Sequence, residues 1–113
     1  RRRYIPEIHA SNARIRSEAE RMAVNMPIQA TATGDIIKMA MIAADAWIRK
    51  EKKEQEVRML LQVHDELVFE IKKEHAQDTT QKIRAIMESI AKLRVPLVVD
   101  VKIGPNWGEQ KQI

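Results

Sequence analysis

Residues 62–70, QVHDELVFE, decide the fold of this chain, because apolar residues recur at every second position on either side of a polar centre. The same period of two covers residues 57–63 before the centre and residues 67–71 after it. A period of two is typical of half-buried strands. We therefore predict an antiparallel hairpin with residues 64–66 at its tip.

The length of the tip follows from which residues share a face. A two-residue tip would place Val63 opposite Glu66, which puts the apolar residues of the two strands on opposite faces. A three-residue tip instead pairs Val63 with Leu67, Leu61 with Phe69 and Met59 with Ile71. We predict this second register because it buries both strands on one face. Neither Gly nor Asn is present for the left-handed position that such a tip prefers, so we also expect backbone strain there.

The tip displays one imidazole and two carboxylates, from His64, Asp65 and Glu66. At about 4 Å, two such anions repel by roughly 4 kcal/mol at an effective dielectric constant of 20, which a divalent cation would relieve. Magnesium prefers carboxylate oxygens and also binds substrate phosphates. A two-metal phosphoryl-transfer site needs carboxylates on more than one strand, and no second acidic cluster is an obvious partner. The alternative is an ordinary solvated turn.

Two helices are predicted before the hairpin. The first begins near Ser11 or Asn12, with an apolar stripe at Ile15, Ala19, Met22 and Met26. Pro27 should kink it, and Asp35 is a plausible N-cap for the second helix, residues 36–53. This helix is apolar nearly all round and is therefore expected at the centre of the fold.

A third helix and a third strand are predicted after the hairpin. Apolar residues return to helical spacing over residues 76–93, Pro96 ends this helix, and residues 97–103 alternate as a strand. The order α-α-β-β-α-β predicts one α+β domain, with a small, mostly antiparallel sheet packed on helices.

A polar row on the first helix is a candidate DNA-binding surface. Arg21, Asn25 and Gln29 are four residues apart and so line up on one face, away from the apolar stripe. The minor groove offers hydrogen-bond acceptors at every base pair, so such a row can bind duplex DNA with little reading of its sequence. The net charge of +4 favours this interpretation, because residues 1–58 hold 12 basic and 8 acidic side chains and residues 59–113 hold 8 of each. A solvated polar face is the alternative.

Composition excludes several other classes of protein. The chain has no Cys, which excludes disulfides, thiolate nucleophiles and Cys-type zinc sites. The apolar stretch 36–48 contains Lys38 and Asp45 and is too short to span a bilayer. We expect a cytoplasmic protein without a membrane partner. The chain starts without Met, which we interpret as a piece of a longer protein.

Six segments together resemble the C-terminal part of the family A DNA polymerases, of the bacterial DNA polymerase I type. They are RRRYIPEI (1–8), AERMAVNMPIQ (19–29), DIIK (35–38), QVHDELVFE (62–70), VPL (95–97) and GPNW (104–107). The fourth is the most specific and resembles motif C of that family. Ala30 departs from the usual glycine, and Thr33 with Gly34 makes the segment before Asp35 one residue longer than the common pattern.

The resemblance implies a fold region and a role for each site residue. Residues 12–113 would be the distal part of the palm subdomain, and residues 1–11 would lead from the fingers. Asp65 would bind catalytic magnesium, with Glu66 as the adjacent catalytic carboxylate and His64 near the primer 3′ end. The helix row would contact the primer–template minor groove: Arg21, Asn25 and Gln29.

The resemblance also implies an activity for the parent protein. It would be a DNA-directed DNA polymerase of replication and repair, associated with the bacterial nucleoid, that adds deoxynucleotides to a primer on a template through two magnesium ions. The chain carries only one arm of that metal site, so we expect no synthesis by these residues alone. The alternative is a non-catalytic module that binds duplex DNA. An unpaired sheet edge also predicts self-association.

Overall fold

The computed structural model describes residues 2–113, apart from the side chain of residue 33. In chain order the elements are η1 (Pro6–His9), α1 (Ala13–Gln29), the π-helical η2 (Ala30–Ile36), α2 (Ile37–Lys50), β1 (Val57–Val63), β2 (Glu66–Ile71), η3 (Lys73–His75), α3 (Ala76–Ser89), β3 (Lys102–Ile103) and β4 (Lys111–Gln112). The predicted α+β class and the order α-α-β-β-α-β are confirmed, with β4 added. No helix among the described residues is long and apolar enough to cross a membrane.

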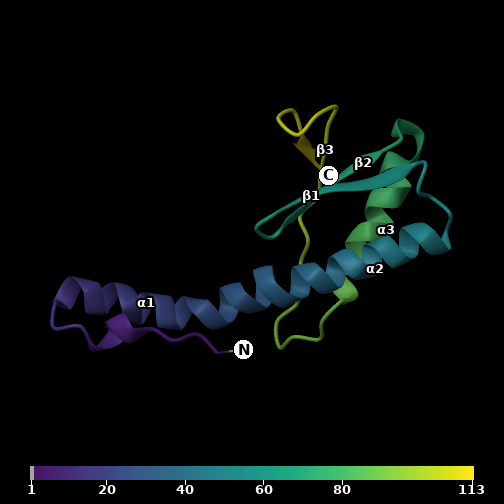
Figure 1. Ribbon diagram of the computed structural model, residues 1–113. Helices are drawn as coiled ribbons and strands as arrows, with labels where there is room; N and C mark the ends of the chain where they lie inside the picture. Colours follow the sequence, from purple (N-terminus) through teal and green to yellow (C-terminus); the bar gives the residue numbers. More distant parts are fainter. Residues whose placement is uncertain (1) are drawn as a thin grey trace.

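The molecule is elongated because α1 extends away from the other elements. Figure 1 shows α1, η2 and α2 as one rod, with the hairpin and α3 gathered over the α2 half. The extents are 59 × 29 × 23 Å and the radius of gyration is 18.1 Å, whereas a compact domain of this length would have a radius of gyration of about 13 Å. The α1 half therefore stands outside the main core and packs mainly on η1.

Helix α1 begins at a capping residue, whereas at its other end the helical path continues without a cap. Asn12 caps its start, since the side-chain oxygen accepts from the backbone N–H groups of Arg14 at 2.9 Å and Ile15 at 3.4 Å. This confirms the predicted start. At the other end Pro27 lies inside α1, and the helical path continues past it as η2. The Thr31 hydroxyl donates to the Pro27 carbonyl at 2.6 Å.

Asp35 lies within η2, so the prediction that it caps a second helix is wrong. A cap is needed only where backbone N–H groups lack a helical partner, and here the preceding turns supply one. A π-helix accommodates an extra residue without breaking a helix. This explains why the longer segment around residue 34 leaves one continuous rod.

The main core lies where α2, the hairpin and α3 meet. Ile48, Val57 and Ile83 form its centre. Four partly buried side chains pack around them: Trp47, Phe69, Ile71 and Met87.

Helix α2 buries one stripe instead of its whole circumference. Its buried residues are Ile37, Ala40, Ala44 and Ile48, which share one face. Met39 and Ile42, on other faces, are 47% and 72% exposed. The predicted central position is therefore wrong within the described residues, because the hairpin and α3 cover a single side.

The hairpin register differs from the prediction through a β-bulge at Leu60. Val57 pairs with Ile71 and Met59 with Phe69, but beyond the bulge Leu61 pairs with Val68 and Val63 with Glu66. The turn therefore has two residues, His64 and Asp65. The extra residue in β1 changes the parity midway, so the hairpin has a two-residue tip and still buries apolar partners together near its base.

The predicted third strand is largely unpaired among the described residues. Only Lys102–Ile103 forms ladder bonds, with β4 and not with the first hairpin. Residues 97–101 keep the alternation of partly buried and exposed positions, and α3 ends at Ser89, earlier than predicted. The outer edge of β2 also has no ladder partner in the described part of the chain.

The 97–101 segment is held by a carboxylate on α3 and not by ladder bonds to a neighbouring strand in the described part of the chain. Glu88 Oε1 accepts the Val99 backbone N–H at 3.1 Å and Arg84 Nε at 3.0 Å. The Val99 N–H, together with the Arg84 guanidinium, holds the pKa of Glu88 below its usual value. The segment is thus anchored to α3, and it leaves open space on the side that faces β2.

Candidate functional site

The tip of the β1–β2 hairpin is exposed and has an unusual backbone. His64 has a φ of 53°, which is left-handed. In two-residue hairpin turns, a first residue with positive φ is normally Gly, Asn or Asp. The Gln62 side-chain amide donates to the His64 carbonyl at 2.5 Å. The expected backbone strain at the tip is confirmed, although it arises in a two-residue turn and not in the predicted three-residue one.

Asp65 and Glu66 occupy the turn and the first position of β2. Both are exposed, and within the described residues neither forms an ion pair or a side-chain hydrogen bond. These free carboxylates have the oxygen ligands that magnesium prefers. Across residues 2–113, however, no group of three His, Cys, Asp or Glu side chains could hold a metal ion. Asp65 and Glu66 thus supply two oxygen donors of the type that magnesium prefers.

A wide groove brings the tip close to the end of the long helix. The groove has a volume of about 1150 Å³ and lies between β2, α3 and the 97–112 segment. Asp65 and Glu66 line it together with Ala32 and Ile36 of η2. The tertiary structure thus joins two segments that are about thirty positions apart in sequence, at a single open surface.

The predicted polar row lies on α1 as expected. Arg21, Asn25 and Gln29 are all exposed and follow one another at four-residue spacing. The Arg21 guanidinium donates to the Ser17 hydroxyl at 3.2 Å, one helical turn earlier. Gln29 lies three residues before Ala32, so the row leads toward the groove. The apolar stripe beside the row is only partly covered: Ala19 is 3% exposed, and Met22 is 41% exposed.

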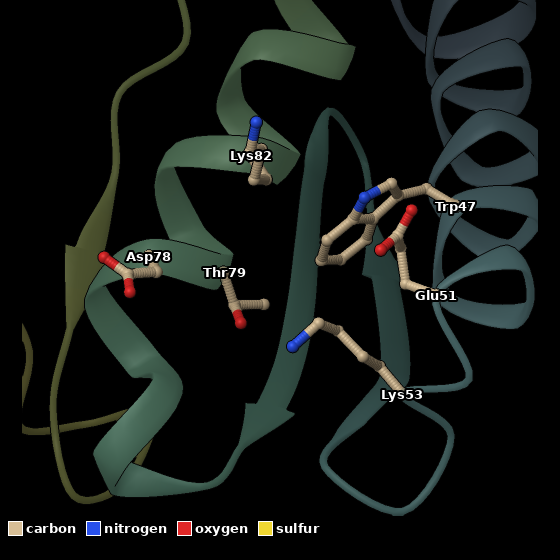
Figure 2. A pocket seen from close by; sticks show the side chains of 6 residues that line it. All are labelled: Trp47, Glu51, Lys53, Asp78, Thr79 and Lys82. Atoms are coloured by element: carbon tan, nitrogen blue, oxygen red, sulfur yellow. The ribbon is translucent and has the colours of Figure 1, made fainter.

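A second, smaller pocket lies at the base of the hairpin and was not predicted. Figure 2 shows its lining: Trp47, Glu51, Lys53, Asp78, Thr79 and Lys82. Its volume is about 250 Å³, and both signs of charge surround it. The Lys53 ammonium is held by Glu56 at 3.3 Å. No tip residue contributes to this pocket, so its position is separate from the candidate metal-binding carboxylates. Its residues come from α2, the following turn and α3, which only the fold brings together.

Comparison with known proteins identifies the family. The sequence-family model for DNA polymerase family A matches residues 1–109. The chain belongs to DNA polymerase family A. The predicted resemblance to this family is thereby confirmed.

Individual relatives agree with this assignment. The chain is 46% identical over 109 residues to DNA polymerase I of Pseudomonas aeruginosa, which covers 96% of this chain and 12% of that protein. It is 49% identical over 111 residues to DNA polymerase I of Bacillus subtilis, with 98% and 12% covered. The chain thus spans about an eighth of the length of these relatives.

A solved structure is also similar in fold. It is the POL domain of Pol1 from M. smegmatis in complex with DNA primer-template and dNTP. Its TM-score is 0.68 at 47% sequence identity, and the match covers 86% of this chain and 17% of that one. At this identity the likeness supports both the fold and the family.

Proposed function

We propose that this chain is the distal palm part of a DNA-directed DNA polymerase, with residues 1–11 leading from the fingers. The parent enzyme adds deoxynucleotides to a primer 3′ end on a DNA template, in replication and repair, in the bacterial cytoplasm at the nucleoid. The observation that carries this proposal is family membership over residues 1–109, in a chain whose hairpin tip presents two free carboxylates. The similar M. smegmatis structure is a complex with primer-template and dNTP, which supports the same substrates here.

Asp65 is the proposed magnesium ligand, and Glu66 is the neighbouring catalytic carboxylate. A bound pair of magnesium ions would stabilise both the attacking and the leaving oxygens in phosphoryl transfer. Both side chains are exposed beside the groove and carry no competing ion pair within residues 2–113, which leaves their oxygens available. His64, at the same tip, is the proposed contact to the primer 3′ end.

Arg21, Asn25 and Gln29 form the proposed minor-groove contact. The row is exposed on a helix that extends beyond the core, and it leads toward the groove that Asp65 lines. A duplex that lies along α1 would therefore have one end beside the hairpin tip. Phosphate neutralisation by Arg side chains makes such binding salt-dependent.

The alternative function is a non-catalytic module that binds duplex DNA. One observation favours it: the described residues contain no complete set of three metal ligands. In that case the polar row binds DNA while the tip carboxylates have no catalytic role. The unpaired edge of β2 additionally supports self-association of the isolated chain.

Primer extension by the whole polymerase that contains these residues separates the two functions. Asp65→Ala should abolish extension while duplex binding largely survives, whereas Asp45→Ala, an exposed control on α2, should change neither. Arg21→Ala should weaken duplex binding more than Arg14→Ala outside the row, by a larger factor at low salt than at high salt, because the variant loses a salt-dependent contact. Full extension by Asp65→Ala would contradict the catalytic role and favour the alternative function, a non-catalytic module that binds duplex DNA. Template-dependent synthesis by the 113-residue chain alone would contradict the assignment as one arm of the metal site.

A further inference from the structure

We propose that Gln62 is a positioning residue for the hairpin tip: its side-chain amide holds the His64 carbonyl and thereby the left-handed turn that presents Asp65. This inference rests on the proposed function, because it assigns to Gln62 a share in placing the catalytic carboxylate. Gln62 acts through the backbone and touches no substrate.

The turn needs such a support because its first residue is unfavourable there. His64 has a φ of 53°, and an L-residue with a side chain adopts this region at a cost in free energy that glycine avoids. No glycine occurs between residues 35 and 103, so the hairpin itself provides no intrinsically left-handed residue. A hydrogen bond made only in this conformation shifts the balance toward it.

The carbonyl that Gln62 binds has no partner in the ladder. The last pair before the turn is Val63 with Glu66, so the His64 carbonyl lies outside the strand pairing. Gln62 Nε2 donates to it at 2.5 Å, across two positions in sequence. Glutamine is long enough to reach forward from the strand into the turn and is uncharged, so it adds no charge beside the two carboxylates.

The bulge at Leu60 sets the face on which Gln62 stands. Beyond the bulge Gln62 pairs with Leu67, which shares a face with Phe69 on the core side of the sheet. A β1 strand without the bulge would place Gln62 on the opposite face. The bulge and the amide therefore act together: one orients the end of β1, and the other holds the turn that follows.

The test is a double-mutant cycle in the whole polymerase, measured by single-nucleotide primer extension. The variants are Gln62→Met, which keeps the length but removes the donor, His64→Gly, which removes the cost of the left-handed residue, and the pair combined. Gln81→Met on α3 is the matched control, since Gln81 is also exposed and forms none of these contacts. Asp65→Ala runs in parallel as the test of the proposed function.

Gln62→Met should lower kcat about threefold to tenfold, the range expected for one lost hydrogen bond, with little change in the KM for primer-template. In the His64→Gly background the same substitution should change kcat by no more than about twofold. An equal loss in both backgrounds would overturn the inference, because it would mean that Gln62 contacts the substrate directly. No loss in either background would overturn it as well.

A crystal structure of Gln62→Met gives a readout that does not depend on activity. We expect the His64 φ to leave the left-handed region, or the tip to become disordered. An unchanged tip would contradict the positioning role. If Asp65→Ala retains full extension, the proposed function fails, and this structural result alone then decides whether Gln62 holds the turn.

Discussion

Truncation of Ile83 tests whether the hairpin and α3 are held together by a single small core. Ile83 is 5% exposed and packs with Ile48 and Val57. Buried Ile→Ala substitutions cost about 2–5 kcal/mol through lost burial and the cavity left behind. Alanine regains a few tenths of a kcal/mol in helix propensity, so we expect the free energy of unfolding to fall by about 2–4 kcal/mol. For a chain of this size that corresponds to roughly 8–16 °C in Tm.

Ile42→Ala is the matched control, because Ile42 is also a helical isoleucine but is 72% exposed. Its effect should stay within about 0.5 kcal/mol. Urea and thermal denaturation followed by far-ultraviolet circular dichroism measure both variants, and the m-value should stay constant if only stability changes. Equal shifts for the two variants, or a loss below about 1 kcal/mol for Ile83→Ala, would refute the assignment of the core to this cluster.

Two further predictions concern the C-terminal segment. Because the pKa of Glu88 is lowered in the fold from its usual 4.5, the ionised carboxylate stabilises the folded state above that pH. This contribution is lost as the pH falls through the lower folded pKa. Glu88→Gln should therefore flatten the fall in the urea midpoint below pH 4.5. A urea midpoint that falls below pH 4.5 as steeply as in the unsubstituted chain would contradict this. Gly104→Ala should raise hydrogen exchange over residues 102–113, because an added Cβ would collide with the Glu109 backbone carbonyl. Gly108→Ala should not, since its nearest contact is 3.4 Å away, and equal exchange in the two variants would argue against this turn.

The hairpin shows how far a sequence pattern predicts a sheet. The alternation over residues 57–63 and 67–71 correctly predicted both strands, because side chains on a strand point to opposite faces in turn. The register was wrong because the pattern assumes one residue opposite one residue throughout. A bulge at Leu60 breaks that assumption, and the alternation of apolar residues does not mark it.

The helices show a similar division. Asn12 was a sound start signal because capping depends on a side chain and the next few N–H groups, all of which are local. The interpretation of α2 as a central helix failed because composition reports apolar faces but not which neighbours cover them. Asp35 had the residue type of a cap but stood within a continuous helix, where no cap is needed.

The site was predictable in its residues but not in its assembly. His64, Asp65 and Glu66 were recognisable as a polar tip between two apolar strands, and Arg21, Asn25 and Gln29 as a row on one helix face. Their roles in metal and DNA binding stay predictions. The groove that places the tip opposite η2 joins segments with no local signal in common.

The sequence by itself determined the family, the order of the elements and the residues at the hairpin tip, because each depends on local spacing or on side-chain identity. Only the tertiary structure decided the two-residue turn, the left-handed backbone of His64 and the hydrogen bond from Gln62 that accompanies it. It also decided that α2 packs on one side and that residues 97–101 are held by Glu88 instead of a neighbouring strand. The physical reason is that coverage depends on contacts between segments distant in sequence and that the register depends on a bulge; the turn and its local hydrogen bond follow from that register, and no period of two encodes it.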